Sequence, residues 1–267
     1  MSEDLPRWQT MTTAEVTALA ASDPVAVLPL AAVEQHGPHL PLETDCIIGD
    51  GLLCHACRLL PAEFPVRVLP PLSVGASGEH GDFPGTLSLE PETLIATICD
   101  YGRAVASAGV RRLLLSNSHG GNRAAMDMAA LRLRRECGLL VVKANYFRFP
   151  PPEPPPFGAD ELRHGLHGGA LETAMMMHLA PEQVRLERRT MAASLGRELE
   201  RGLRHLQPEG TGAFAWMARD LNHDGVVGDA TLADAATGAR LVAHYGGVLA
   251  ELIQDTRAFP LDALAPL

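Results

Sequence analysis

Short apolar runs alternate with helix-like segments over the first half of this chain, and this alternation restricts the fold more than any other feature. Four apolar runs are predicted to be strands: 25–33, 66–69, 112–115 and 139–142. The segments between them have helical patterns: 45–60, 91–108 and 123–136. The first run, VAVLPLAAV, is continuously apolar, as strands buried on both faces are. The alternation predicts an α/β fold with a mostly parallel sheet covered by helices on both faces.

Two details of these helices follow from the same patterns. Asn122 precedes the third helix in the position of an N-cap, where its side chain would accept a hydrogen bond from a free backbone N–H. In the first helix, the spacing of the apolar residues leads us to expect Ile48, Leu52 and Leu59 in the core.

The second half of the chain is less regular. A proline-rich run, PPPEPPP at 150–156, interrupts the pattern, but residues suited to a functional site return after it. We therefore interpret the run as a surface excursion of one domain that spans residues 1–267. Helices are predicted near 195–206 and 232–253, with a loop at 222–229 between them.

Composition and charge argue against several classes of function. The 267 residues are 46% hydrophobic, which is enough to form a sizeable core. A formal net charge of -10 argues against binding to nucleic acids or anionic membranes, because both need clustered Lys and Arg. The five cysteines are scattered, the first residues do not resemble a signal peptide, and no apolar stretch reaches about 18 residues. We therefore expect a cytoplasmic protein without disulfides or membrane spans.

The strongest functional signal comes directly after the first predicted strand. Glu34 and His36 are two residues apart, so at a strand end they would point to the same side of the pleat. Gly37 then allows the chain to turn, and Asp45 follows at the start of the next helix. Ligands of open α/β folds bind at this carboxyl edge of the sheet. The motif therefore predicts a metal site or an active site there.

Two further motifs lead to the same edge. His119 follows the third predicted strand, and Gly120 and Gly121 leave backbone N–H groups free near a helix start, where negative charge is favoured. His167 and Glu172 lie five residues apart, across a glycine turn and the start of another helix. This set of carboxylates and imidazoles suits Zn²⁺ or Mn²⁺, with Fe²⁺ as a further option.

Most of the other histidines are interpreted as ordinary surface or core residues. They are His39, His55, His178, His205, His223 and His244. The pair Cys54 and Cys57 is metal-like in spacing, but no second pair accompanies it.

The motifs resemble those of the creatininase (creatinine amidohydrolase) family. The matching stretches occur in the family's order: EQHGPHLPLETD at 34–45, GEHGDFPGTLSL at 78–89, SNSHGGN at 116–122, HGGALETA at 167–174 and GVVGDATLADAATG at 225–238. The resemblance implies a three-layer α/β/α sandwich and two divalent metal ions per chain. It also implies hydrolysis of a C–N amide bond by a hydroxide that the two metals activate, in a homo-oligomer that is commonly a hexamer.

The resemblance also implies roles for individual residues. Glu34 and His119 resemble ligands of one metal, His36 resembles a ligand of the other, and Asp45 resembles the carboxylate that bridges them. His167 resembles the histidine beside the reacting amide, from which a proton passes to the leaving nitrogen. Contacts with the substrate are assigned to four further residues: His80, Gly120, Gly121 and Arg163.

The chain also departs from the pattern of the true creatininases. They have a Tyr-Glu pair at the positions of Gly120 and Gly121, and that glutamate is a metal ligand. We assign the missing carboxylate to Glu172, which therefore has both a metal-binding and a catalytic role in our prediction. The family's tryptophans near the motif of His167 are missing, and the only tryptophans are Trp8 and Trp216. An aromatic lid for creatinine is therefore not expected.

The sequence thus predicts a metal-dependent amidohydrolase for a small-molecule amide, such as a cyclic amide or a formamide, rather than for ordinary peptide bonds. A peptidase resembling the mycofactocin-maturation branch is one alternative. A small-molecule-binding member that has lost catalysis is another. Arg123, Arg163 or His164 could bind a phosphate or carboxylate of the substrate, and Asn117 or Asn122 could orient the ligand rings.

Overall fold

A parallel sheet of four strands forms the centre of the molecule. The computed structural model of the chain describes residues 5–265. The strands of this sheet are β1 (Val25–Leu30), β2 (Val66–Val68), β3 (Arg112–Asn117) and β4 (Leu140–Asn145), and their order is β2-β1-β3-β4. Leu30 pairs with Asn117, which pairs with Asn145, so three strands end at one level. The segments that follow them therefore leave from the same carboxyl edge.

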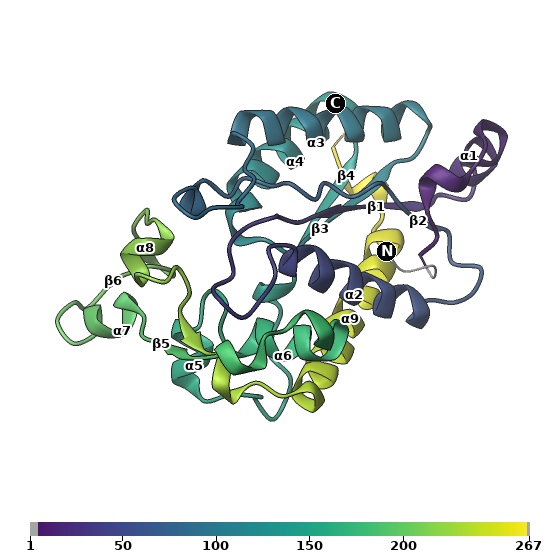
Figure 1. Cartoon of the computed structure of the whole chain (residues 1–267). Helices are drawn as coiled ribbons and strands as arrows, with labels where there is room; N and C mark the ends of the chain where they lie inside the picture. Colours follow the sequence, from purple (N-terminus) through teal and green to yellow (C-terminus); the bar gives the residue numbers. More distant parts are fainter. Residues whose placement is uncertain (1–4, 266–267) are drawn as a thin grey trace.

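Helices cover both faces of the sheet. The longer helices are α1 (Thr13–Ala20), α2 (Thr44–Leu59), α3 (Pro91–Ser107), α4 (Arg123–Cys137), α6 (Ala170–Leu179) and α9 (Ala235–Ala258). In Figure 1, α3 and α4 lie above the sheet, whereas α2, α6 and α9 lie below it. This arrangement confirms the predicted three-layer α/β/α sandwich.

The strand residues alternate between two hydrophobic cores. Val25 and Val27 of β1 pack with α2, α6 and α9, whereas Ala26, Leu28 and Leu30 pack with α3 and α4. Successive side chains of a strand point to opposite faces, so a continuous apolar run buries both faces at once. The apolar run that predicted β1 thus provides the interior of both layers.

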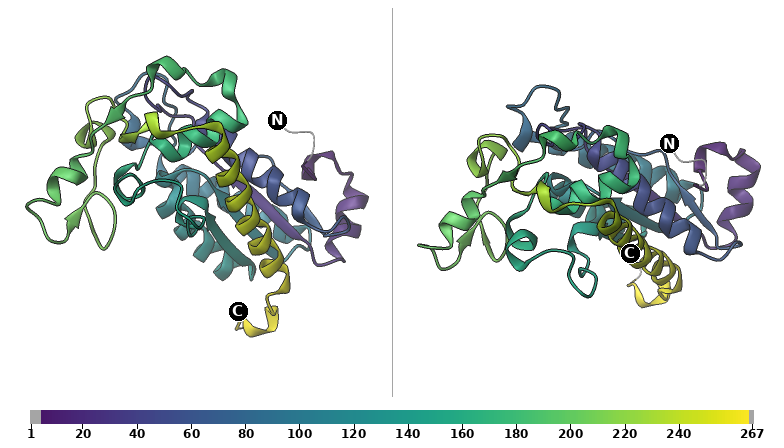
Figure 2. Two further views of the ribbon diagram at one scale, coloured as in Figure 1. Left: turned by 90° about the horizontal axis from the view of Figure 1, so that it is seen from below. Right: turned by 60° about the horizontal axis from the view of Figure 1, so that its bottom comes forward.

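Shorter elements connect and extend these layers. The short helices are α5 (Ala159–His164), α7 (Leu195–Leu199) and α8 (Ala218–Leu221). The short strands are β5 (Met191–Ala192), β6 (Leu206–Gln207), β7 (Gly212–Ala213) and β8 (Gly228–Asp229). Residues 195–221, which include α7, β6, β7 and α8, project to one side of the molecule (Figure 2). We call this stretch the 195–221 segment.

The structure corrects four details of the sequence analysis. The helix predicted near 195–206 ends at Leu199, and the loop predicted at 222–229 contains β8. Leu59 is 53% exposed and not in the core, because it lies in the last turn of α2. Asn122 makes no cap bond to α4, because it already has helical backbone angles and its side chain binds other loops.

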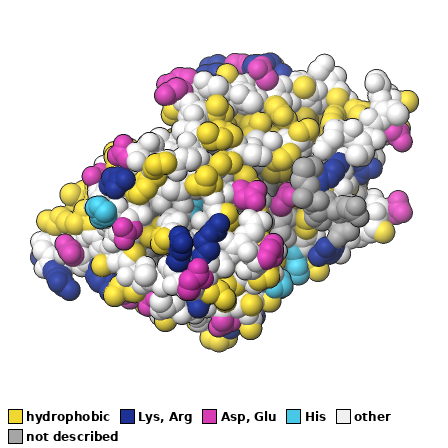
Figure 3. Space-filling model, viewed as in Figure 1, with side chains coloured by type: hydrophobic (Ala, Val, Ile, Leu, Met, Phe, Trp, Pro, Cys, Tyr) yellow, Lys and Arg dark blue, Asp and Glu magenta, His cyan; other side chains and the backbone are white. Residues whose placement is uncertain are grey.

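The exterior of the molecule carries charges of both signs. On the face shown in Figure 3, Lys and Arg side chains are interspersed with Asp and Glu side chains, around hydrophobic side chains at the middle of the view. Within residues 5–265, no helix is long and apolar enough to cross a membrane.

A buried arginine joins the start of β3 to the C-terminal helix. The guanidinium of Arg112 donates to both the Asp23 carboxylate and the backbone carbonyls of Thr256 and Phe259, at 2.8–3.0 Å. Hydrogen bonds from Arg112 lower the pKa of the Asp23 carboxyl more than its burial raises it. This pair therefore stabilises the folded chain while Asp23 is ionised.

We expect Asp23→Asn to lower the free energy of unfolding at pH 7 by about 2 kcal/mol, because Arg112 loses its charged partner. Asparagine also tolerates the left-handed backbone of Asp23 (φ 53°), so the change isolates the charge. The pKa of Asp23 is lowered in the folded state, so the difference from wild type should vanish as the pH falls through that pKa. Urea unfolding at several pH values measures both effects. Asp100→Asn, which removes an exposed ion pair with Arg103, is the control and should change little.

Candidate metal centre

The loop after β1 brings the first predicted ligands into the interior. Glu34 and His36 are each 1% exposed, although β1 has already ended at Leu30. Gly37 turns the chain with a positive φ of 70°, and a Cβ there would lie 2.8 Å from a methyl group of Val226. The turn returns the chain to α2, whose second residue, Asp45, is 2% exposed. The three side chains therefore converge from a loop and a helix start.

Glu34, Asp45 and His119 form the first group of ligand-type side chains. The Nδ1 atom of His119 lies 3.2 Å from Oε2 of Glu34 and 3.3 Å from Oδ2 of Asp45. One ligand atom from each of the three residues lies within 4.8 Å of the others. His119 reaches this position because β3 ends beside β1 at the carboxyl edge.

His36, His167 and Glu172 form the second group. Their ligand atoms also lie within 4.8 Å of one another. The Nε2 atom of His36 is 3.4 Å from Oδ1 of Asp45 and 4.0 Å from Oε2 of Glu172. Asp45 therefore presents one oxygen to His36 and the other to His119, which is the geometry expected of a carboxylate shared by two cations.

Three buried atoms at this centre have no hydrogen-bond partner among the described residues: Glu34 Oε2, His36 Nε2 and Asp45 Oδ2. Buried polar atoms nearly always have a partner, because leaving one unpaired costs free energy. All three atoms belong to the two groups. Nitrogen and carboxylate oxygen donors suit Zn²⁺ or Mn²⁺, so the residues fit divalent metal ions at these positions.

Backbone carbonyls orient the first two histidines. Nδ1 of His36 lies 3.1 Å from the carbonyl oxygen of Glu34, and Nε2 of His119 lies 3.0 Å from that of Ala76. If each of these nitrogens donates, the lone pair of the other ring nitrogen faces the carboxylates. Ligating histidines commonly have this second contact. Within the described residues, Asn117 and Asn122 make no hydrogen bond to these rings, so they do not orient the rings directly.

The asparagines act on the backbone instead. Asn117 accepts from the backbone N–H of His119 and donates to its carbonyl. The side chain of Asn122 accepts from the N–H of Ala76 and donates to the carbonyl of Ala31 and to Asn117. These bonds fix three loops of the carboxyl edge relative to one another.

The concentration of carboxylates shifts the pKa values of the histidines. Burial lowers the pKa of His36, but the facing carboxylates outweigh it, Asp45 foremost, and raise that pKa to about 9. Burial also acts against the charged form of His119, yet Glu34 and Asp45 raise its pKa well above the ordinary value. Burial raises the pKa of Glu172 to about 7. The centre thus favours bound positive charge, either protons or metal ions.

Gln35 fixes the tautomer of His80. Its amide nitrogen donates to the carbonyl of Gly225 at 2.6 Å and contacts Nδ1 of His80 at 2.8 Å, while its amide oxygen accepts from the N–H of Gly37. Because an amide nitrogen has no acceptor capacity, Nδ1 of His80 must accept. The proton of neutral His80 is therefore on Nε2, which lies 3.5 Å from Oε1 of Glu34.

His167 stacks between two other histidines. Its ring centroid lies 4.2 Å from that of His36 and 4.3 Å from that of His80. Its Nε2 lies 2.7 Å from the carbonyl oxygen of Gln35, and its Nδ1 lies 3.7 Å from Oε1 of Glu34. Burial lowers its pKa well below the ordinary value, with His36 and His80 adding to the shift. His167 is therefore neutral, with an acceptor nitrogen toward the centre.

A buried carboxylate supports the segment that carries His167 and Glu172. Glu161 of α5 accepts from the backbone N–H groups of Ala170 and Asp229, at 2.7 and 2.8 Å. Three glycines surround this carboxylate, because a Cβ on any of them would lie within 2.7 Å of its Oε1: Gly165, Gly169 and Gly228. Glu172 accepts from the N–H of Gly168 at 2.6 Å, just before α6. The sequence analysis missed Glu161, since its partners are distant in the chain.

The sequence analysis also missed Glu79, whose carboxylate occupies the space beside Gly121. A Cβ on Gly121 would lie 2.5 Å from Oε1 of Glu79 and 2.3 Å from the carbonyl oxygen of Ala76. Oε1 of Glu79 is 3.6 Å from Nε2 of His119, on the ring nitrogen that faces away from Glu34 and Asp45. Among the described residues, Glu172 is therefore better located than Glu79 to supply the missing carboxylate.

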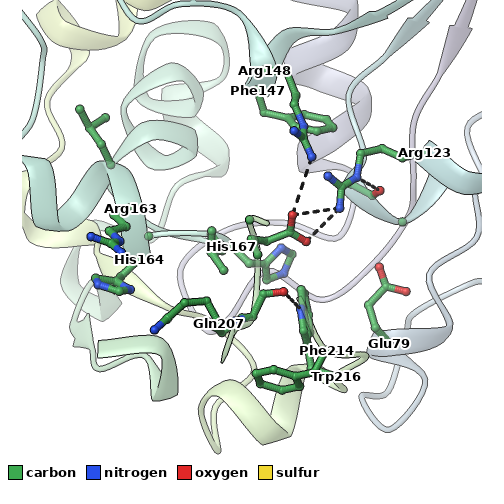
Figure 4. A pocket seen from close by; sticks show the side chains of 18 of the residues that line it. Glu79, Arg123, Phe147, Arg148, Arg163, His164, His167, Gln207, Phe214 and Trp216 are labelled. Atoms are coloured by element: carbon green, nitrogen blue, oxygen red, sulfur yellow. Dashed lines mark hydrogen bonds and ion pairs between the residues drawn. The ribbon is translucent and has the colours of Figure 1, made fainter. Parts of the chain in front are cut away.

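A large cavity opens over the centre, with a volume of about 1220 Å³. Its walls include the residues predicted to contact substrate: His80, Gly120, Gly121 and Arg163. Nε of Arg163 lies 2.6 Å from Oε1 of Glu200, and Nε2 of His164 lies 3.1 Å from Oε2 of the same carboxylate. Three aromatic side chains also line the cavity (Figure 4). Phe147 comes from the turn after β4, and Phe214 and Trp216 come from the 195–221 segment. The sequence analysis did not predict that these aromatic side chains line the cavity.

The parallel sheet and the buried cluster at its carboxyl edge define an α/β protein with a site suited to divalent metal ions. The chain belongs to the creatininase family, since the family model described as creatinine amidohydrolase matches residues 9–253. This match confirms the resemblance found in the sequence.

Some relatives of this chain are named as peptidases and others as creatinine amidohydrolases. The mycofactocin precursor peptide peptidase of Mycobacterium tuberculosis is 36% identical over 231 residues, covering 84% of this chain and 82% of the relative. The creatinine amidohydrolase of Pseudomonas putida is 34% identical over 188 residues, covering 64% of this chain and 70% of the relative. A crystal structure of creatininase superposes with a TM-score of 0.79 at 26% identity, covering 97% of this chain and all of that one. The family is thus one of amide hydrolases.

We expect Asp45→Asn to lower the metal content of the purified protein from close to two ions per chain to below one. Asparagine removes the charge and one anionic oxygen, and Asp45 is the residue whose two oxygens face His36 of one group and His119 of the other. Elemental analysis after dialysis with Zn²⁺ or Mn²⁺ measures the content. Asp50→Asn, on the same helix but outside both groups, is the matched control. An unchanged content in Asp45→Asn would contradict a shared carboxylate.

We also expect metal binding to release protons at pH 7. His36 and His119 have raised pKa values and are protonated in the metal-free protein, yet only a neutral imidazole binds a metal. Protons therefore compete with the metal, and affinity should increase as the pH rises toward about 9, the raised pKa of His36. Calorimetric titration with Zn²⁺ in buffers of different ionisation enthalpy gives the number released, expected to be at least one per chain.

Proposed function

We propose that this chain is a metal-dependent amidohydrolase that holds two divalent ions, Zn²⁺ or Mn²⁺, and hydrolyses an amide bond in a peptide-sized substrate. The observation that carries the proposal is the Asp45 carboxylate, whose two oxygens face two separate groups of ligand-type side chains. The solved relatives support the choice of ions, since one is titled creatininase Mn and another is a variant creatininase of Zn-Zn type.

Each group has a distinct set of donors in this proposal. Glu34 and His119 would hold one ion, His36 and Glu172 would hold the other, and Asp45 could contribute an oxygen to each. Bound divalent ions would supply Lewis acidity, polarising a substrate carbonyl and making a water molecule more acidic. The carbonyl contacts of His36 and His119 keep their lone pairs directed inward without the help of substrate.

We assign proton transfer to His167. Its Nε2 is bonded to the carbonyl of Gln35, so its free Nδ1 can take up a proton at the centre and pass it to the leaving nitrogen. Nε2–H of His80 points toward Glu34 and keeps that carboxylate ionised and oriented. The N–H groups of Gly120 and Gly121, on the cavity wall, are assigned to the developing negative charge on the carbonyl oxygen.

The size of the cavity supports a peptide rather than creatinine. Sites for small molecules typically enclose about 300–1,000 Å³, and this cavity holds about 1220 Å³. Relatives named as peptidases also match a larger share of the chain than the creatinine amidohydrolase does. Aromatic side chains on the cavity wall offer apolar contacts to substrate side chains.

A small cyclic amide or formamide is the second candidate. The family membership and the creatinine amidohydrolase relative support it. A member that binds without catalysis is less consistent with the unpaired, buried atoms of Glu34, His36 and Asp45, which suit a cation rather than an organic ligand.

The test compares substrates on the Zn- or Mn-loaded protein. We expect short peptides to be hydrolysed with kcat/KM values at least roughly tenfold above those of creatinine, lactams and N-formyl compounds, and a chelator to abolish the reaction. His167→Gln should lower kcat by roughly 10²–10⁴-fold, the usual contribution of general acid–base catalysis. His178→Gln, outside both groups, is the control. Faster turnover of a small amide would favour the second candidate, and activity that persists in the chelated protein would contradict the proposal.

A further inference from the structure

We propose that Arg123 and Arg148 form a subsite for a carboxylate group of the substrate, and that Glu209 occupies this subsite when substrate is absent. The proposal rests on the proposed function, because it concerns the substrate of the same cavity. It adds the chemical class of that substrate, a molecule with a free carboxylate.

Glu209 already has the contacts that a bound carboxylate would have. Nη2 of Arg123 donates to both of its oxygens, at 2.9 and 3.1 Å, and Nη2 of Arg148 lies 3.9 Å from one of them. In Figure 4, dashed lines join Arg123 and Arg148 to the same carboxylate. Charge-assisted hydrogen bonds of this kind are strong contacts between arginine and a carboxylate. The arrangement is therefore a carboxylate site with an internal occupant.

The charges at this position do not balance. Two guanidinium groups face one carboxylate, and within residues 5–265 no second carboxylate pairs with either arginine. Across the cavity, Glu200 faces Arg163 and His164, of which only the arginine has a fixed charge. One positive charge thus remains unpaired beside Glu209 and none beside Glu200. This excess favours Arg123 and Arg148 as the site for an anionic group.

Arg123 also has hydrogen-bond donors to spare. A guanidinium carries five N–H groups. In the described structure, those on Nη2 bind Glu209 and the one on Nε binds the carbonyl of Gly120 at 3.2 Å, which leaves those on Nη1. A second carboxylate can therefore bind without first breaking every existing contact.

The internal ion pair is accessible and easily replaced. The side chains of Arg123, Arg148 and Glu209 are 31%, 62% and 35% exposed. Ion pairs in contact with water contribute little free energy, so displacement of Glu209 by a substrate carboxylate costs little. Glu209 lies between β6 and β7 on the 195–221 segment, whereas both arginines follow strands of the central sheet. The occupant and the site thus belong to different parts of the molecule.

The subsite is near the metal centre. Arg123 follows His119 by four residues, immediately after the short 3₁₀ turn η3 (Gly120–Asn122). Both residues line the same cavity. A carboxylate bound at Arg123 would therefore hold a peptide-sized substrate with its amide groups over the centre.

The test measures binding, so its result does not depend on turnover. Calorimetry on the full-length, Zn-loaded protein compares N-acetylphenylalanine with its amide, and N-acetylglutamate α-amide with N-acetylglutamine amide. The first pair tests a terminal carboxylate and the second a side-chain carboxylate. Inorganic phosphate serves as a third anion. We expect at least one carboxylate probe to bind roughly tenfold more tightly than its neutral partner, and more tightly than phosphate.

The variants identify where the carboxylate binds. Arg123→Gln should remove the preference for the carboxylate, Arg148→Gln should reduce it, and Glu209→Gln should tighten binding several-fold because the internal occupant loses its charge. Arg103→Gln and Glu136→Gln, which break an exposed ion pair outside the cavity, are the matched controls. Arg123→Lys, with the charge but not the planar group, should give an intermediate preference. It replaces Arg123→Gln if that variant does not fold.

Two results would overturn the proposal. An Arg123→Gln protein with unchanged metal content and an unchanged preference would show that the carboxylate binds the metal ions instead. Weaker binding in Glu209→Gln would show that Glu209 supports the cavity and does not compete with the ligand. Failure to hydrolyse any peptide would contradict the proposed function alone, because these binding differences are measured without turnover.

Discussion

The site of this protein depends on negative charge held in the interior without enough hydrogen-bond donors to satisfy it. Glu34 and Asp45 are almost fully buried, and one oxygen of each has no hydrogen-bond partner in the described structure. Isolated buried carboxylates are strongly unfavourable, so cations at this position stabilise the fold. Protons on His36 and His119 supply them in the metal-free chain, and their raised pKa values express that dependence. Metal ions would replace those protons.

The fold was predictable from sequence because the two central strands, β1 and β3, are buried on both faces. The apolar run of β1 predicted a central strand, and the register of β1, β3 and β4 then brings the following loops to one edge. The argument that Glu34 and His36 point to the same side of a strand pleat was less accurate. They do not extend the pleat of β1, which ends at Leu30, but lie in a loop, where Glu34 faces one group and His36 the other. Their convergence depends on the turn at Gly37, which the sequence did signal.

The supporting residues were not predictable in the same way. Glu161, Gln35 and Asn122 bind backbone groups that are 9 to 190 residues away in the chain. No local pattern indicates such a partner, and Asn122 even has the local pattern of a helix cap. The aromatic wall was missed for a related reason, since Phe214 and Trp216 come from a segment with little regular structure. Sequence patterns predict what repeats along an element, whereas these contacts join separate loops.

The buried centre and the opposite wall of the cavity come from different parts of the chain, and this separation affects substrate specificity. Loops at the carboxyl edge and the first turns of α2 and α6 carry the proposed metal-binding groups, and buried carboxylate and amide side chains fix these segments to one another. The opposite wall of the cavity comes from the 195–221 segment, which projects from the layers and contacts the sheet side through exposed ion pairs such as Arg123 with Glu209. Substitutions in that segment can therefore change the size and charge of the cavity at little cost to the centre. Within a family that contains both a creatinine amidohydrolase and peptide peptidases, this wall is where we expect substrate preference to be determined.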